Sequence, residues 1–212
     1  MTGGTGYIGS RLIPLLAGRG HTVRALVRPG SESRLPQGAI PLTCSPLEGS
    51  TFFPFLTPGS TFVQLLGVPH PSPSKAELFR QVDLVSVRES VSAAKGSGAG
   101  HFIYLSVAQP APALHAYVAV RSEGEELIRS SGMNATILRP WYVLGPGHRW
   151  PCLFLPAYWI CGMIPATRDT ARRLGLVTIR QMLRALMHAV ENPARGVRIV
   201  DVDGIRRPMP LP

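Results

Sequence analysis

The sequence predicts an α/β protein built on a doubly wound parallel sheet, a sheet that carries helices on both faces. Two observations favour this fold class. Apolar runs typical of buried strands alternate along the chain with stretches of helical periodicity, and such alternation favours parallel strands joined by right-handed crossovers. The chain has 212 residues, of which 45% are hydrophobic and 16% charged, which fits a single domain over residues 1–212 with a substantial core.

Each element is predicted from its local pattern. Short apolar runs bounded by turn residues predict strands at 22–28, 39–42, 61–67, 101–107, 135–139 and 197–202. Apolar residues at helical spacing predict helices at 8–18, 76–95, 117–131 and 177–190. Residues 141–170 are irregular and aromatic, and we interpret them as a small, partly irregular substrate or lid region beside the carboxyl ends of the strands.

A glycine-rich turn opens the first predicted helix. Gly3, Gly6 and Gly9 are spaced as G-x-x-G-x-x-G, which allows a tight strand-to-helix turn, close approach of a diphosphate to the backbone, and close packing of the helix. The helix amino terminus then offers N–H groups and partial positive charge. The turn, helix and following strand predict a Rossmann-like dinucleotide-binding unit. The residues expected to contact the cofactor here are Gly3, Thr5, Gly6, Tyr7, Ile8 and Gly9.

The end of the strand at 22–28 indicates which dinucleotide binds. An NAD site usually offers a carboxylate at this point, whereas this chain has Arg28, with Ser31 nearby. A guanidinium binds a phosphate bidentately and stays charged. We therefore predict NADP as the cofactor, bound in part by Arg28 and Ser31, with NAD less favoured; the alternative is an exposed loop arginine.

Further motifs carry a resemblance to a known family. Ser106 ends the run HFIYLSV, Tyr117 follows eleven residues later, and a glutamate-rich helix leads to ATILRP at 135–140. With the glycine turn, these features resemble the extended or atypical short-chain dehydrogenases/reductases, a family with an NAD(P)-binding Rossmann fold that includes NAD-dependent epimerases and dehydratases. The resemblance covers the chain to about Gly147. It implies that Tyr117 exchanges a proton with a substrate oxygen and that Ser106 holds that oxygen.

The chain departs from this family four residues after the tyrosine. The family has a lysine there, which binds the nicotinamide ribose, and this chain has Arg121. Arginine supplies a positive charge, but its rigid planar fork is not equivalent to an ammonium group. We predict Arg121 as both a catalytic and a cofactor-binding residue. In the alternative, Tyr117 is a half-buried helix residue and Arg121 pairs with Glu125 one turn later.

The segment at 63–70 corresponds to the family's fourth strand, which lines the cofactor, so Leu66 and Gly67 are predicted to contact it. His70 could reach a substrate or phosphate, although a loop histidine between prolines is more often exposed and inert. Aromatic residues gather just after the strand at 135–139, and they suit an apolar, planar or lipid-like small molecule or, equally, a lid that fills its own core. The cluster comprises Trp141, Tyr142, His148, Arg149, Trp150, Phe154, Tyr158 and Trp159.

Two functions follow from these residues. One is an NADP-dependent reductase or isomerase acting on a small, apolar carbonyl or hydroxyl compound. The other is a non-catalytic dinucleotide-binding sensor or assembly subunit, which Arg121 favours. A weaker alternative is quinone-linked work or peripheral contact with a membrane through residues 151–165.

Composition narrows the partners and the compartment. The net charge is +10, but the basic residues are scattered arginines without a dense run, so we expect no nucleic-acid partner. Cys44, Cys152 and Cys161 have no metal-ligand spacing, so we predict no metal site and no disulfide framework. We expect a reducing, cytoplasmic location.

One strand is missing from the predicted pattern. A glycine-rich turn of this kind ordinarily follows a strand, and that strand lies at the centre of a doubly wound sheet. Its absence before Thr2 would leave the edges of two neighbouring strands unpaired in the interior. We expect either that the natural protein begins upstream of Met1 or that the structure shows a gap or a substitute strand there.

Overall fold

A computed structural model describes residues 1–111, 113–147, 169–170 and 173–207. Its strands, all paired in parallel, form a four-stranded sheet in the order β3-β4-β5-β8 and the pairs β1-β2 and β6-β7. The strands are β1 (Val23–Val27), β2 (Ala39–Thr43), β3 (Thr61–Gln64), β4 (His101–Leu105), β5 (Ala135–Leu138), β6 (Tyr142–Leu144), β7 (Leu176–Thr178) and β8 (Val197–Val200).

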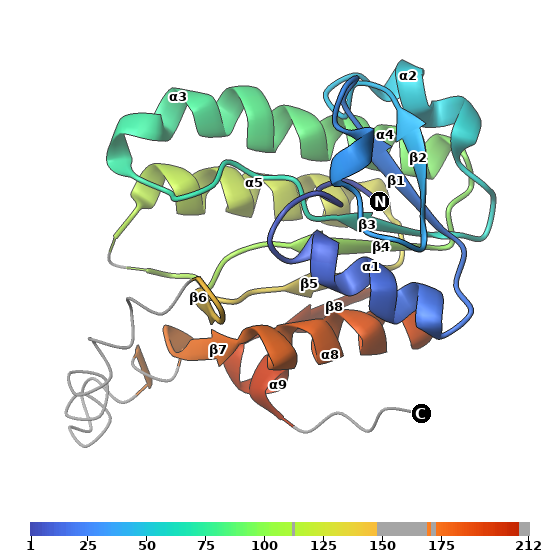
Figure 1. Ribbon diagram of the computed structural model, residues 1–212. Coiled ribbons are helices and arrows are strands. Elements are labelled where there is room, and N and C mark those ends of the chain that lie inside the picture. Colours follow the sequence, from blue (N-terminus) through green and yellow to red (C-terminus); the bar gives the residue numbers. More distant parts are fainter. Residues whose placement is uncertain (112, 148–168, 171–172, 208–212) are drawn as a thin grey trace.

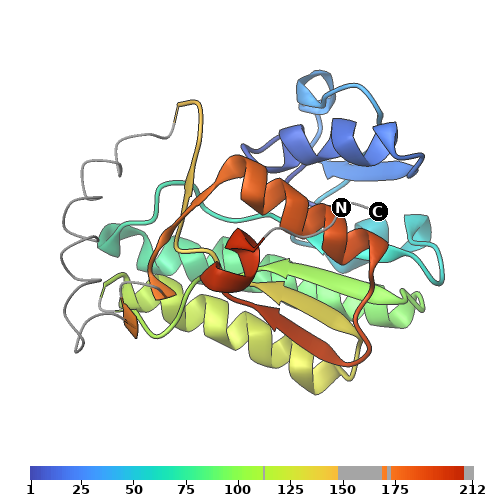
Figure 2. The same ribbon diagram turned by 90° about the horizontal axis from the view of Figure 1, so that it is seen from below.

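Helices lie on both faces of the four-stranded sheet, with α4 and α5 on one face and α1, α8 and α9 on the other (Figures 1 and 2). The longer helices are α1 (Gly9–Gly18), α4 (Val85–Gly96), α5 (His115–Ser131) and α8 (Ile179–Glu191). The shorter segments are η1 (Glu32–Arg34), α2 (Gly49–Phe52), η2 (Phe53–Phe55), η3 (Pro73–Lys75), α3 (Ala76–Leu78), η4 (Phe79–Leu84) and α9 (Val202–Arg206). The predicted fold class, a parallel sheet with helices on both faces, is confirmed.

The alternation of side chains along the strands divides the core into two layers. Val63 and Ile103 face α1 and α8, whereas their neighbours Phe62 and Phe102 face α4 and α5. The rings of Phe62 and Phe102 stack with their centroids 5.4 Å apart. Because both faces are buried, these strands read as continuous apolar runs, which is why they could be recognised from the sequence.

The structure differs from the predicted elements mainly after residue 141. The strand pair β6-β7 and helix α9 were not predicted, because three-residue strands and a five-residue helix carry too little periodicity to recognise. The helix predicted at 76–95 contains a π-helical stretch, η4. Most of the predicted lid and all of the segment 151–165 lie outside the described residues. Among the residues that are described, none of the helices is long and apolar enough to cross a membrane.

The structure contains the gap expected at the centre of the sheet. Met1 and Thr2 lie between β1 and β3 and bond to both. The N–H of Leu26 donates to the Met1 carbonyl at 2.8 Å, and the N–H of Thr2 donates to the Val63 carbonyl at 3.0 Å. Beyond these two residues, no strand of the described chain joins β1-β2 to the four-stranded sheet.

Candidate functional site

The glycine-rich turn is packed so tightly that side chains are excluded at its key positions. A Cβ on Gly9 would lie 2.2 Å from the Gly3 carbonyl oxygen. A Cβ on Gly3, whose φ is +69°, would lie 2.8 Å from the backbone of Leu65. The N–H of Gly6 donates to the Gly3 carbonyl at 3.0 Å, which closes the turn. The predicted spacing therefore forms a compact cradle against the end of β3.

Thr2 fixes this cradle to the sheet. Its hydroxyl donates to Gln64 Oε1 at 2.6 Å and accepts the N–H groups of Leu65 and Leu66, both at 3.2 Å. Gln64 is itself held by Ser86 and Ser90 from α4, at 2.9 and 3.1 Å. The Leu66 backbone, a predicted cofactor contact, is thereby placed beside the glycine turn.

The amino end of α1 is suited to an anion. No described side chain caps it, and its first turn contains no acidic residue, so its partial positive charge is uncompensated. Arg11 adds a full charge nearby, since its guanidinium carbon lies 4.1 Å from the centroid of the Tyr7 ring and its Nη1 donates to the Tyr7 carbonyl at 2.8 Å. The sequence analysis did not identify Arg11, although it lies only two residues after Gly9.

Tyr7 connects the turn to the C-terminal part of the chain. A Cβ on Gly145 would lie 2.2 Å from the Tyr7 hydroxyl oxygen and 2.8 Å from Ile179. The Tyr7 hydroxyl is therefore seated against the backbone just after β6. This contact places the glycine turn next to the region that the sequence assigns to the substrate.

Arg28 and Ser31 lie just after the carboxyl end of β1. Arg28 is exposed and Ser31 is half-buried, and the Ser31 N–H donates to the Arg28 carbonyl at 3.0 Å. The neighbouring acidic residue, Glu32, accepts the hydroxyl of Thr43 at 2.9 Å. The geometry thus leaves Arg28 at the surface in the place where the sequence predicts a ribose phosphate.

Tyr117 and Arg121 are brought together one turn apart on α5. The guanidinium carbon of Arg121 lies 5.1 Å from the centroid of the Tyr117 ring, within the range of a cation–π contact. Phe79 packs edge-on against Tyr117 with the ring centroids 5.1 Å apart. The alternative pairing of Arg121 with Glu125 is wrong, because Arg121 bonds instead to Asp83 Oδ1 at 2.5 Å and to the Leu105 carbonyl at 2.9 Å.

The Arg121–Asp83 pair is buried, with side-chain exposures of 5% and 0%. Burial opposes the charge on Arg121, but nearby Tyr117, Tyr104 and Asp83 raise its pKa above the ordinary value, so the guanidinium stays charged. Asp83 also accepts the Val68 N–H at 3.0 Å. The pair therefore joins η4, α5 and the loop after β3.

The loop after β3 lies directly over this pair. A Cβ on Gly67 would lie 2.1 Å from Arg121 Nη2 and 3.1 Å from Asp83 Oδ1, so only glycine fits there without movement of the arginine. Gly67 and Arg121, both predicted to contact the cofactor, are thus neighbours. His70 is exposed and has a positive φ of 51°.

Ser106 belongs to a second buried cluster. Its hydroxyl donates to Glu125 Oε1 at 2.6 Å, and Gln109 donates to the same oxygen at 2.8 Å. Arg139 binds both carboxylate oxygens, and Arg129 binds Oε2 at 2.7 Å. Although burial opposes ionisation, the bonds from Arg139 and Ser106 lower the pKa of Glu125. Because Glu125 takes its one proton, Ser106 can donate to a substrate oxygen only after its hydroxyl rotates.

A cavity of about 320 Å³ lies beside this cluster, at the carboxyl ends of β5 and β8. Gln109 and Arg139 contribute to both the cluster and the cavity wall. Further lining comes from Ala108, Asp169, Arg173, Ile199 and Asp201. The sequence analysis missed Asp83, Gln109 and Arg139, of which Asp83 gave a signal, as a charged residue within an otherwise apolar helical pattern.

Comparison with known proteins identifies the family. A family described as NAD(P)H-binding matches residues 3–147, which is more than half of the chain. A ceramide reductase from Caulobacter vibrioides is 24% identical over 209 residues, which cover 98% of this chain. The chain spans 64% of the length of that relative.

Solved structures share the fold at low sequence identity. The enzyme WbmH from Bordetella bronchiseptica, solved with NAD+, has a TM-score of 0.69 at 19% identity, covering 94% of this chain and 73% of that one. A UDP-glucuronic acid 4-epimerase from Bacillus cereus, solved with NAD, has a TM-score of 0.67 at 18% identity, with coverages of 94% and 76%. The chain belongs to the NAD(P)H-binding family, and its fold is the Rossmann-like fold of the extended short-chain dehydrogenases/reductases.

Proposed function

We propose that the protein is an NADP-dependent reductase that acts on an apolar carbonyl compound. The observation that carries the proposal is the contact of Tyr117 with the charged Arg121, whose guanidinium lies against the loop at Gly67. A proton donor held by a cation beside a dinucleotide cradle is the arrangement that carbonyl reduction requires. The similarity to a ceramide reductase supports an apolar substrate.

The chain's residues divide the work as follows. The turn built by Gly3, Gly6 and Gly9 would let the cofactor diphosphate approach the N–H groups at the amino end of α1, and Arg28 would bind the ribose 2′-phosphate. The bound nicotinamide would supply the hydride. Tyr117 would give a proton to the substrate oxygen, while Arg121 fixes the tyrosine ring and the loop at Gly67.

The cofactor choice is tested by substitution of Arg28. Charge-assisted bonds to a phosphate contribute about 1.5 to 3 kcal/mol, so the native chain should bind NADPH about 10- to 150-fold more tightly than NADH. Arg28→Asp should reverse the preference. Arg195→Asp is the matched control, because it makes the same charge change in the exposed loop before β8, at the opposite edge of the sheet. Equal affinities of the native chain in calorimetric titrations would contradict the NADP assignment.

The catalytic assignment is tested with Tyr117→Phe, which keeps the ring against Arg121 and Phe79. We expect NADPH oxidation with apolar aldehydes, ketones and a ceramide substrate to fall about 10²- to 10⁴-fold, while NADPH affinity changes little. Turnover that survives at the native rate would exclude Tyr117 as the proton donor.

A second candidate function is a dinucleotide-binding module without catalysis. It is favoured by the engagement of both neighbouring polar groups, because Asp83 holds Arg121 and Glu125 takes the Ser106 proton. This candidate expects tight NADPH binding and no oxidation with any carbonyl in the panel. It also expects Tyr117→Phe to have no functional effect.

A further inference from the structure

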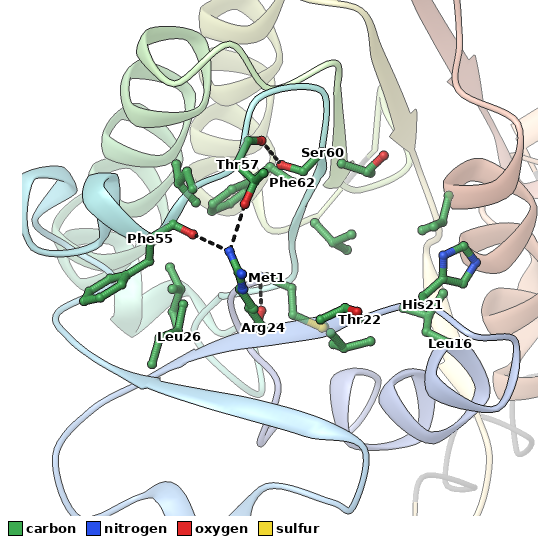
Figure 3. A pocket seen from close by; sticks show the side chains of 16 residues that line it. Met1, Leu16, His21, Thr22, Arg24, Leu26, Phe55, Thr57, Ser60 and Phe62 are labelled. Carbon is green, nitrogen blue, oxygen red and sulfur yellow. Dashed lines mark hydrogen bonds between the residues drawn. The ribbon is translucent and has the colours of Figure 1, made fainter.

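A buried polar network of Thr2, Gln64, Ser86 and Asp83 runs from the glycine turn to the helix η4. Residues 61–63 of β3 line a groove of about 460 Å³ (Figure 3), but Gln64, the next residue, is fully buried and belongs to this network instead. Thr2 donates to Gln64 Oε1, and Gln64 Nε2 donates to the Ser86 hydroxyl at 2.9 Å. That hydroxyl donates to the backbone carbonyl of Asp83 at 2.9 Å. The cofactor cradle is thereby joined to Asp83 through buried groups alone.

The side chain of Asp83 extends this network in two directions. Its Oδ1 accepts a bond from Arg121 Nη2, and its Oδ2 accepts the Val68 N–H at 3.0 Å. Arg121 belongs to α5, and Val68 belongs to the loop after β3. The Asp83 carboxylate therefore lies where η4, α5 and this loop meet.

The loop after β3 is held by side chains at both of its ends. Its first two N–H groups donate to the Thr2 hydroxyl oxygen, both at 3.2 Å, and the N–H of Val68 donates to Asp83. Between these anchors, Gly67 lies against the guanidinium of Arg121. The position of the loop is therefore set by Thr2 at one end and by Asp83 at the other.

Arg121 is engaged entirely within this assembly. Its Nη1 donates to the Leu105 carbonyl, its Nη2 donates to Asp83, and its Nε is buried. Only 5% of the side chain is exposed. A guanidinium placed in this way acts on the site through what it touches, which is the ring of Tyr117 and the backbone at Gly67.

We propose that Asp83 is a positioning residue of the reductase and that it sets two parts of the site at once. Through Arg121 it fixes the ring of Tyr117, and through Val68 it fixes the loop that is predicted to contact the cofactor. A carboxylate suits this task because its two oxygens accept bonds from a cation and from an amide at the same time. The role toward Tyr117 rests on the proposed reductase function, whereas the role toward the loop rests only on NAD(P) binding.

The variant Asp83→Asn tests both roles. An amide offers one acceptor oxygen in place of two, so either Arg121 or the Val68 N–H loses its partner. We expect NADPH affinity in calorimetry to fall about 3- to 10-fold, which is the effect of one lost hydrogen bond. We expect kcat at saturating NADPH to fall at least about tenfold, because the proton donor is no longer held in place.

Two comparisons separate positioning from folding. Val91→Ala truncates a buried side chain of α4 outside the network, so it should lose stability in urea denaturation while keeping NADPH affinity and kcat. The double variant Asp83→Leu, Arg121→Met should regain stability, because apolar side chains replace the buried pair. Its kcat should equal that of Arg121→Met alone, since Asp83 acts on Tyr117 through Arg121. Its NADPH affinity should be lower than that of Arg121→Met, since the Val68 N–H has lost its acceptor.

Native NADPH affinity and native kcat in Asp83→Asn would overturn the proposal. Equal losses in Val91→Ala would also overturn it, because the effect would then be one of stability alone. A double variant with kcat far below that of Arg121→Met would exclude the route through Arg121. If the native chain reduces no carbonyl, the proposed reductase function fails, and the NADPH affinity of Asp83→Asn still decides the role toward the loop.

Discussion

Substitution of Gly9 by alanine should damage cofactor binding through a backbone clash, without removing any side chain. An alanine Cβ at this position would lie 2.2 Å from the Gly3 carbonyl oxygen and 2.9 Å from both Gly3 C and Gly4 Cα. All three are backbone atoms, so no flexible side chain can move aside. The amino end of α1 and the turn at Gly3 and Gly4 must therefore separate.

The size of the effect follows from this overlap. Ordinary contact with a Cβ begins near 3.4 Å, so the two backbone segments must move apart by about 1 Å. Forcing extra atoms into a packed interior costs about 1 to 3 kcal/mol of folding free energy. A displacement of this size also breaks at least one N–H bond to the cofactor diphosphate, which weakens binding about 10- to 150-fold.

For this variant, calorimetric NADPH titration measures the loss of cofactor affinity, and urea denaturation measures the loss of folding free energy. Gly18→Ala is the matched control, since it lies at the exposed end of the same helix and its added Cβ meets no atom within 4 Å. The control should bind NADPH like the native chain and should be slightly more stable, by about 0.5 to 1 kcal/mol. If Gly9→Ala binds NADPH as tightly as Gly18→Ala does, the glycine turn is not the diphosphate cradle.

Three further predictions concern buried titratable side chains. Burial and Arg198 lower the pKa of His101 to about 4. Folding stability should therefore fall by up to about 3 kcal/mol as the pH drops from about 6.5 to 4. In urea denaturation, the variant His101→Gln should lack this decline. Asp83→Ala should cost about 3 to 5 kcal/mol by leaving Arg121 charged and unpaired, and an Asp83→Leu, Arg121→Met double variant should recover most of that loss. Glu125→Gln should cost about 2 to 4 kcal/mol, whereas Glu126→Gln, on the exposed side of the same helix, should change stability by less than about 0.5 kcal/mol.

The parts of the fold that could be predicted are those with a local cause. The strands β3, β4 and β5 are buried on both faces and read as apolar runs, and α5 and α8 show helical spacing over several turns. The glycine turn was recognisable because the atoms that require glycine there are close by. A Cβ on Gly6 or Gly9 would meet the backbone of Gly3, and a Cβ on Gly3 would meet the backbone at the end of β3. The central gap was predictable for a related reason, since the pattern of a doubly wound sheet requires a strand where the chain has only Met1 and Thr2.

The parts that could not be predicted depend on partners distant in sequence. The acid one helical turn after Arg121 is Glu125, yet the partner of Arg121 is Asp83, 38 residues away. Glu125 in turn is bound by Ser106 and Arg139, from the ends of two different strands. Spacing along α5 gives no means of choosing between these acids, because the choice depends on how η4 and β5 pack around the helix.

The Asp83 carboxylate and the Leu105 carbonyl explain why an arginine fits at the position where the resemblance to the short-chain dehydrogenases/reductases implies a lysine. Arg121 bonds at once to the Asp83 carboxylate and the Leu105 carbonyl, while its flat face lies near the Tyr104 and Tyr117 rings. A planar fork with donors on separate nitrogens meets these demands together, whereas an ammonium group concentrates its donors at one point. The arginine at position 121 is therefore matched to Asp83. The same bonds hold Arg121 against the ring of Tyr117, the residue that the proposed reductase would use as its proton donor.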